Sequence, residues 1–329
     1  MGVRFSWVFG IWGLCFAARE AQEWDGNRVD LFIGQKPVLD TARSGTESRR
    51  AMSLIDDLQS RTVIADGAMG TELWAAGVSE GVCLEELCVR AQETVIEVHK
   101  RYIASGARLL RTNSFGANSV RLATHGYEHR VGEINWTAAQ LARDCARGTG
   151  AYVAGSVGPL GLTEAEANAR GVDREAVFIE QIGALLDGGA QGIVLETFTD
   201  VGELLLAIHA KHSLHHCPVI ALLAPGVDGN LPDGTPLADA FARLRAAEAD
   251  LVGVNCIAPD AALASLKACA DAGPLAAFPS AGLPPYAVEP AAFAKAGAEM
   301  GIVGVNLLGG CCGAGPAYIT ALAAEFPEP

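Results

Sequence analysis

The feature that most constrains the fold is an alternation of short apolar runs with longer amphipathic or alanine-rich runs, which starts near Thr62. Eight runs have the length and β-branched content of strands: Thr62–Asp66, Arg108–Asn113, Tyr152–Val157, Gly192–Glu196, Val219–Leu223, Leu251–Asn255, Leu275–Phe278 and Ile302–Asn306. Runs of helical length follow them, at about 85–105, 130–147, 174–188, 200–212, 237–248, 260–272, 289–298 and 315–325. Such regular alternation predicts parallel βαβ units.

Eight strands and eight helices are the content of a single (β/α)8 barrel, the TIM barrel, which is an α/β fold. A doubly wound open sheet is the structural alternative. It loses its best support because no Gly-x-Gly-x-x-Gly follows the first expected strand. Half of the 329 residues are hydrophobic, which is enough for a large core. We therefore expect one barrel over residues 52–329.

Residues 1–51 do not resemble the rest of the chain and form an atypical N-terminal extension. The opening Met1–Arg4 and the apolar run Phe5–Ala18 imitate a signal peptide. We favour a misassigned start, with Met52 as the true first residue, over a targeting signal or a poorly structured extension. In that case Ser53–Leu58 is a helical lead-in to the barrel.

Charge and cysteine usage limit the classes of partner. A net charge of −14 and a pI near 4.9 argue against nucleic acid and anionic membranes. No apolar stretch has the length and purity of a transmembrane helix. Nine cysteines in a long chain fit reduced thiols better than a disulfide scaffold. We expect a cytoplasmic protein whose partners are small molecules.

Polar residues gather at the carboxyl ends of the expected strands, where barrel enzymes carry their chemistry. Asp66, Asn113, Glu196 and Asn255 end four strands, and burying such groups is costly unless they are used. The turn after the first strand consists of Gly67, Ala68, Met69 and Gly70. Its glycines leave backbone amides open to a ligand. The structural alternatives are a turn cap for Asp66, a salt bridge for Glu196 and loop hydrogen bonds for both asparagines.

Two adjacent cysteines, Cys311 and Cys312, follow the eighth expected strand and are flanked by glycines. Neighbouring Cα atoms lie about 3.8 Å apart, too close for a low-strain disulfide. The glycines allow both sulfur atoms to point at one object. Cys256 ends the sixth strand, in the same layer of the barrel, and supplies a third thiolate. Three thiolates with an open fourth position describe a catalytic Zn²⁺ site.

The chemistry of such a site favours a thiol substrate. Zinc lowers the pKa of a bound thiol, which is otherwise about 8.5, and holds it as a thiolate nucleophile. Water activation fits less well, because hydrolytic zinc sites more often use histidine and carboxylate ligands. A Schiff-base aldolase lacks its lysine, since all five lysines lie away from the strand ends. A zinc or thiol sensor protein is the non-enzymatic alternative, but it leaves Asp66 and Glu196 unexplained.

Together these segments resemble the zinc-dependent homocysteine S-methyltransferases, over about residues 60–326. The matching segments are Asp66–Leu73, Thr112–Asn118, Gly155–Pro159, Glu196–Thr197, Val254–Cys256 and Gly309–Gly313. The resemblance implies that Cys256, Cys311 and Cys312 bind zinc and that L-homocysteine accepts a methyl group. It also implies that Glu196, with Asp66 nearby, holds the homocysteine amino group. The amides of Ala68–Gly70 would then receive the carboxylate.

The resemblance indicates the methyl donor less sharply. Gly116–Leu122 and Gly155–Gly158 look most like short bacterial betaine–homocysteine methyltransferases, so betaine is the first expected donor. The animal betaine enzymes carry a donor-binding tyrosine where this chain has Gly116. S-methylmethionine and a methyl-corrinoid carried by a separate protein are therefore alternative donors.

Overall fold

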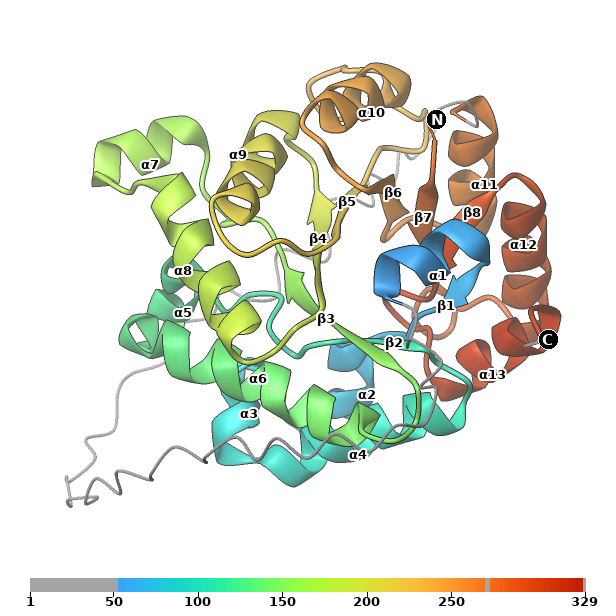
Figure 1. The fold of residues 1–329 in the computed structure, drawn as a ribbon, viewed down its shortest axis with the longest axis horizontal. Coiled ribbons are helices and arrows are strands. Elements are labelled where there is room, and N and C mark those ends of the chain that lie inside the picture. Colours follow the sequence, from blue (N-terminus) through green and yellow to red (C-terminus); the bar gives the residue numbers. More distant parts are fainter. Residues whose placement is uncertain (1–52, 270–272, 328–329) are drawn as a thin grey trace, which may run out of the picture. The chain divides into compact units, whose positions relative to one another are not determined.

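The structure, a computed structural model, describes residues 53–269 and 273–327, which form a barrel of eight parallel strands surrounded by helices (Figure 1). The strand order is β1-β8-β7-β6-β5-β4-β3-β2. The remaining edge, between β1 and β2, is closed by a parallel bridge between Ala65 and Leu109. The amide of Asp66 also donates to the Leu109 carbonyl at 2.9 Å. The predicted (β/α)8 barrel is therefore confirmed.

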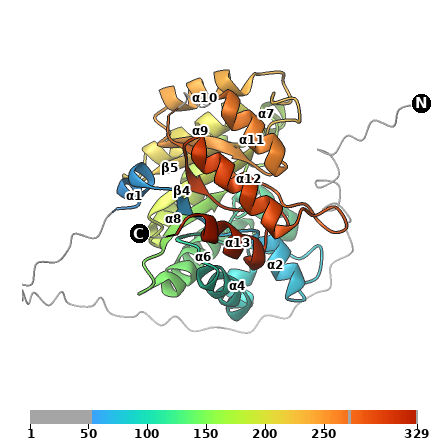
Figure 2. The ribbon, with the colours of Figure 1, turned by 90° about the vertical axis from the view of Figure 1, so that its right-hand side faces the viewer.

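Most elements lie where the alternation predicted them. The strands are β1 (Val63–Ile64), β2 (Leu109–Arg111), β3 (Tyr152–Val157), β4 (Gly192–Phe198), β5 (Val219–Leu223), β6 (Leu251–Asn255), β7 (Leu275–Phe278) and β8 (Val305–Leu308). The helices are α1 (Leu54–Ser60), α2 (Met69–Ala75), α3 (Leu87–Arg90), α4 (Gln92–Ala104), α5 (Ser119–Leu122), α6 (Val131–Ala146), α7 (Glu164–Arg170), α8 (Arg174–Asp187), α9 (Val201–His212), α10 (Leu237–Ala246), α11 (Pro259–Ala268), α12 (Pro290–Ile302) and α13 (Pro316–Glu325). Figure 2 shows α11, α12 and α13 side by side on one flank of the barrel.

The bounds of β1, β2, β4 and β8 differ from the predicted ones, and one expected helix is divided. The eighth strand was expected to begin at Ile302, which instead ends α12. Gly304, with a φ of 92°, then turns the chain into β8. The single helix expected over 85–105 divides at Ala91, whose ψ of 54° interrupts the helical path between α3 and α4. The short helices α2, α5 and α7, in the segments after β1, β2 and β3, were not predicted.

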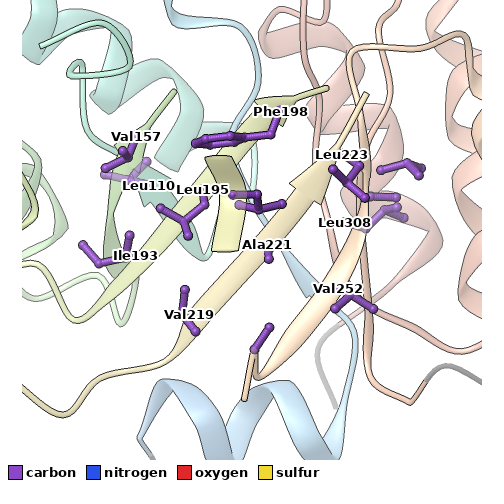
Figure 3. Packing of buried hydrophobic residues seen from close by; sticks show 14 of the residues in the cluster. Leu110, Val157, Ile193, Leu195, Phe198, Val219, Ala221, Leu223, Val252 and Leu308 are labelled. Carbon is purple, nitrogen blue, oxygen red and sulfur yellow. The ribbon is translucent and has the colours of Figure 1, made fainter. Parts of the chain in front are cut away.

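Strand side chains alternate between two apolar clusters, as the two-residue period of a strand requires. In β4, Ile193 and Leu195 join the cluster under the helices (Figure 3), whereas Val194 joins the cluster that fills the barrel. The members of the barrel cluster include Val63, Leu109, Ala154, Val194, Ile220, Leu222, Leu251, Ala276 and Leu307. Two leucines of α1, Leu54 and Leu58, join the same cluster and close its amino-terminal end.

The helical lead-in expected over Ser53–Leu58 is confirmed as α1. The Ser53 side chain accepts from the Asp56 amide while the Asp56 carboxylate accepts from the Ser53 amide, which forms a capping box. The expected extension over residues 1–51, with its proposed boundary at Met52, lies outside the described residues. No helix within 53–269 or 273–327 is long and apolar enough to cross a membrane.

Candidate active site

The barrel interior changes from apolar to polar at the carboxyl ends of its strands. The residues two positions beyond the inward-facing Leu109, Ala154, Val194 and Gly253 are Arg111, Ser156, Glu196 and Asn255. All four are buried. Arg111 Nη1 and Ser156 Oγ both donate to the Glu196 carboxylate at 2.6 Å, so side chains from three strands meet in a polar layer above the apolar cluster.

Three cysteines approach one another beside this layer, and we call Cys256, Cys311 and Cys312 the cysteine cluster. Their Sγ atoms all lie within 4.8 Å of one another. The Sγ atoms of Cys256 and Cys312 are 3.6 Å apart, and those of Cys311 and Cys312 are 4.0 Å apart. Zinc–sulfur bonds of about 2.3 Å at tetrahedral angles would place two sulfur atoms about 3.8 Å apart. The donor set and its spacing therefore fit zinc.

The backbone of β7 and the residue after it holds the cysteines in place. The amide of Cys256 donates to the Phe278 carbonyl at 3.0 Å. The amide of Cys311 donates to the Pro279 carbonyl at 2.7 Å. The turns after β6 and β8 are thus joined through the strand that lies between them, which brings cysteines from distant parts of the sequence together.

The glycines before the cysteine pair allow the turn after β8 to pack closely against the turn after β1. A Cβ added to Gly309 would lie 2.7 Å from the Asp66 carbonyl oxygen. The amide of Gly310 donates to that same oxygen at 3.0 Å. The cysteine cluster is therefore fixed directly beside Asp66.

Hydrogen bonds among the three thiols shift their pKa values in opposite directions. The contacts with Cys256 and Cys311 lower the pKa of Cys312, because two thiols stabilise its thiolate. Contacts with Cys311 and Cys312 raise the pKa of Cys256. A metal ion that binds here displaces protons from these thiols, since thiolates are the ligands.

Arg111 organises the neighbouring carboxylates, and we call Asp66, Arg111 and Glu196 the charged cluster. Its Nε donates to Asp66 Oδ1 at 2.8 Å, and its backbone amide donates to Asp66 Oδ2 at 2.8 Å. Its Nη1 donates to Glu196 Oε2 at 2.6 Å. Its Nη2 donates to the carbonyls of Gly67 at 2.8 Å and Gly310 at 2.7 Å.

The charged cluster is buried, with exposed fractions of 7% for Arg111, 5% for Glu196 and 2% for Asp66. Burial raises the pKa of Asp66 to about 6, although the guanidinium opposes that shift. Burial also raises the pKa of Glu196, against Arg111 and against a 2.6 Å hydrogen bond from Ser156 Oγ. With both carboxylates ionised, the cluster carries a formal charge of −1.

Sequence reasoning missed Arg111. The signal was present, because a charged residue at the end of the run Leu109–Leu110–Arg111 lies on the same strand face as Leu109. An arginine on that face must be buried and paired. The expected strand ran on to Asn113, and this concealed that β2 ends at Arg111.

Asn255 and Asn113 lie in different surroundings. Asn255 Oδ1 accepts from the Thr197 amide at 2.9 Å, and its Nδ2 donates to Thr197 Oγ1 at 2.8 Å. This Nδ2 also lies 4.0 Å from Cys311 Sγ. Asn113 instead donates to the Leu84 carbonyl at 2.7 Å, which corresponds to the loop hydrogen bond weighed as its structural alternative.

The turn after β1 presents fewer amides than its sequence suggests. The amide of Ala68 donates to the Ala314 carbonyl at 3.0 Å, and its own carbonyl accepts from the Tyr102 hydroxyl at 2.9 Å. Met69 and Gly70 form the first turn of α2, where amides have no acceptor within the helix. Those two amides remain for a ligand at this turn.

Comparison with known proteins places this chain in a family. The sequence model of the family described as Homocysteine S-methyltransferase matches residues 63–326. The methionine synthases of Mycobacterium tuberculosis and Mycobacterium leprae are 31% and 30% identical over 305 residues. These matches cover 82% of this chain but 25% of each relative, so the chain spans about a quarter of their length.

Solved structures agree with the sequence comparison. The metallated form of the homocysteine methyltransferase MmuM from Escherichia coli is 29% identical, with a TM-score of 0.69. That match covers 81% of this chain and 96% of MmuM. The oxidized form of MmuM is 30% identical, with a TM-score of 0.70, and covers 81% and 97%. The chain belongs to the homocysteine S-methyltransferase family.

Proposed function

We propose that this protein transfers a methyl group to the thiol of L-homocysteine, giving methionine, with zinc held by the cysteine cluster. Family membership supports the acceptor and the class of reaction. The proposal of a bound metal rests on one observation. Three sulfur atoms lie within 4.8 Å of one another at the mouth of the barrel. Bound zinc would lower the pKa of the homocysteine thiol and maintain it as a thiolate.

We propose that the charged cluster binds the amino-acid end of homocysteine. Its formal charge of −1 complements one ammonium group, and Glu196 is the more exposed of its two carboxylates. We therefore propose that Glu196, with Asp66 nearby, attracts the homocysteine ammonium. The amides of Met69 and Gly70 are proposed to receive the carboxylate. Asn255, which lies beside Cys311, would line the space between these groups and the metal.

Betaine is the first proposed donor, followed by S-methylmethionine and a methyl-corrinoid protein. With either onium donor, the thiolate attacks the methyl group in line and the neutral amine or sulfide leaves, so no covalent enzyme intermediate is needed. The loop around Gly116 supports a cationic methyl compound, because it holds the Glu85 carboxylate, whose Oε1 accepts from the Gly116 amide at 2.8 Å. A Cβ at Gly116 would lie 2.7 Å from that oxygen, so this loop differs from one that carries a tyrosine.

A direct assay tests the proposal. The zinc-loaded protein is incubated with homocysteine and each donor separately, and methionine is measured. Cys311→Ala should lose zinc and turnover together, whereas Cys217→Ala changes a half-buried thiol outside the cysteine cluster and should retain both. Full activity in a metal-free Cys311→Ala protein would contradict the proposed mechanism.

A zinc or thiol sensor remains the second proposal, because Cys256 and Cys312 are close enough to exchange a proton. Cobalt substitution separates the two functions. A methyltransferase changes the cobalt–thiolate absorption when homocysteine is added, whereas a sensor binds the metal without that change. The eight described cysteines are free thiols, which supports a reducing compartment such as the cytoplasm.

A further inference from the structure

Asp66 directs both of its carboxylate oxygens to one residue. Its Oδ1 accepts from Arg111 Nε and its Oδ2 accepts from the Arg111 amide, both at 2.8 Å. Only 2% of the residue is exposed. Both Asp66 oxygens thus accept from the single residue Arg111, whereas the two Glu196 oxygens are divided between Arg111 Nη1 and Ser156 Oγ. Asp66 is therefore the carboxylate that holds the arginine in place.

The Arg111 guanidinium links parts of the site that are far apart in sequence. Through Nη1 and Nη2 it joins Glu196 on β4 to Gly310, the residue before the cysteine pair. Its Cζ atom lies 4.3 Å from the centre of the Phe278 ring. Phe278 in turn accepts the Cys256 amide through its carbonyl. One side chain therefore contacts Glu196 and the residues that support both cysteine turns.

We propose that Arg111 is a positioning residue, which binds Asp66 and fixes the turn before Cys311 at a set distance from Glu196. Asp66 then acts through Arg111 instead of touching the homocysteine ammonium directly. This inference rests on the proposed function, because it concerns the same pocket. It assigns substrate contact to Glu196 and not to Asp66, because Glu196 Oε1 accepts from the Ser156 hydroxyl, which can rotate away, and not from a fixed guanidinium.

The requirement is for an arginine and not simply for a positive charge. The guanidinium donates in several directions at fixed angles, whereas a lysine ammonium is a point charge on a flexible stem. Arg111→Lys should therefore keep the positive charge but lose the set of hydrogen bonds that the guanidinium donates. Arg111→Met removes both and leaves Asp66 as a buried, unpaired carboxylate.

The first experiment compares these variants in zinc affinity, measured by competition with a chromophoric chelator, and in the KM for homocysteine. Arg111→Lys is expected to recover most of the thermal stability that Arg111→Met loses. It should nevertheless bind zinc at least tenfold more weakly and raise the KM for homocysteine, because changes next to metal ligands typically cost 10-fold to 100-fold in affinity. Arg147→Met removes an exposed arginine and serves as the matched control. Wild-type zinc affinity and KM in Arg111→Lys would overturn the proposal.

The second experiment is a double-mutant cycle that separates Asp66 from Glu196. Asp66→Asn should raise the KM for homocysteine in the wild-type background and have no further effect beside Arg111→Met. Glu196→Gln should raise the KM in both backgrounds, because it removes a direct contact. An equal effect of Asp66→Asn in both backgrounds would show direct substrate contact and refute the proposal. Where Arg111→Met does not fold, Arg111→Gln takes its place.

The readouts distinguish this proposal from the proposed function. Zinc affinity and thermal unfolding are measured without substrate, so they report on Arg111 even where no donor yields methionine. Asp66→Asn should also restore thermal stability to Arg111→Met, since it removes the unpaired buried carboxylate. Absence of that rescue, together with wild-type zinc affinity in Arg111→Met, would eliminate the positioning role and leave the methyltransferase assay to decide the function.

Discussion

Asn255 holds an unusual backbone at the site. Thr197 and Cys256 both have positive φ values, of 65° and 61°, which side chains other than glycine rarely adopt. The Asn255 side chain bonds to the amide and the hydroxyl of Thr197 and directly precedes Cys256. The buried side-chain amide of Asn255 therefore stabilises the strained backbone at Thr197 and Cys256.

Removing that amide should affect both stability and the metal. We expect Asn255→Ala to lower the free energy of unfolding by about 2 kcal/mol, because it leaves the Thr197 amide unpaired. Zinc affinity should fall as well, since Cys256 loses its neighbour. Urea unfolding and chelator competition measure the two effects. Asn168→Ala, at an exposed position of α7, is the control, and equal behaviour of the two variants would contradict this role.

His99 predicts an acid sensitivity that is independent of the site. The imidazole is fully buried in α4, and neither ring nitrogen has a hydrogen-bond partner among the described residues. Burial lowers its pKa from 6.5 to about 4. The unfolded chain therefore binds the proton more tightly, and the neutral form stabilises the fold above pH 6.5. That stability is lost as the pH falls through 6.5 towards 4.

The pH dependence can be isolated by substitution. Between pH 7.5 and pH 4, the wild type should lose about 3 kcal/mol more stability than His99→Leu, by the linkage between a pKa shift and unfolding. The difference isolates the imidazole, because Asp66 and the other titrating groups are present in both proteins. His129→Leu changes an exposed histidine and should follow the wild type. Parallel stability curves for wild type and His99→Leu would disprove the assignment.

The site was only partly predictable at the scale of residues. The cysteines were predictable, because two follow a strand between glycines and the third ends another strand in the same layer. Arg111 was not, because its role comes from contacts with residues 45, 85 and 199 positions away along the chain. The hydrogen-bond partner of the Asn113 side chain could not be foreseen either, since it depends on β2 ending two residues earlier, at Arg111.

At the scale of elements, the alternation of apolar runs located all eight strands, and β3, β5, β6 and β7 have the predicted bounds. Buried parallel strands are continuous apolar runs, so their ends are visible in the sequence. The short helices after β1, β2 and β3 were not visible, because seven residues or fewer show no clear helical period. Tertiary contacts decide whether such short segments are helical.

Two glycines at the ends of β8 offer a matched test of close packing. Gly304 and Gly313 both have positive φ values, of 92° and 77°. A Cβ at Gly304 meets nothing within 4 Å, whereas at Gly313 it would lie 1.8 Å from the Gly282 carbonyl oxygen. Both positions require a positive φ, but they differ in the space that a Cβ would find.

We therefore expect unequal effects from the same substitution. Gly304→Ala should cost about 1 kcal/mol of stability, from the left-handed backbone alone, and leave zinc affinity unchanged. Gly313→Ala should cost at least about 3 kcal/mol and weaken zinc binding, because the turn that carries Cys312 must move away from Gly282. Urea unfolding and chelator competition report both quantities. Equal losses in the two variants would mean that the contact with Gly282 is unimportant.

At the scale of the whole molecule, the barrel depends on the short helix α1 before its first strand. Leu58 is completely buried and Leu54 is 3% exposed, and both belong to the cluster that fills the barrel. Leu54 Cδ2 lies 3.0 Å from the position a Cβ would take on Gly192, at the start of β4. The compact unit accordingly begins at Ser53 and not at the first strand.

This arrangement predicts where the chain can be shortened. A chain that begins at Met52 keeps the Ser53 capping box and both leucines, so we expect its free energy of unfolding and zinc affinity to match those of the full chain. A chain that begins at Arg61 loses both leucines and should be destabilised by at least about 4 kcal/mol, since each buried leucine is worth about 2–5 kcal/mol. Leu58→Ala in the full chain checks the cause, with an expected loss of about 3 kcal/mol. If the chain from Met52 were instead destabilised by several kcal/mol, residues before it would have to contribute to the fold, and the proposed boundary would be wrong.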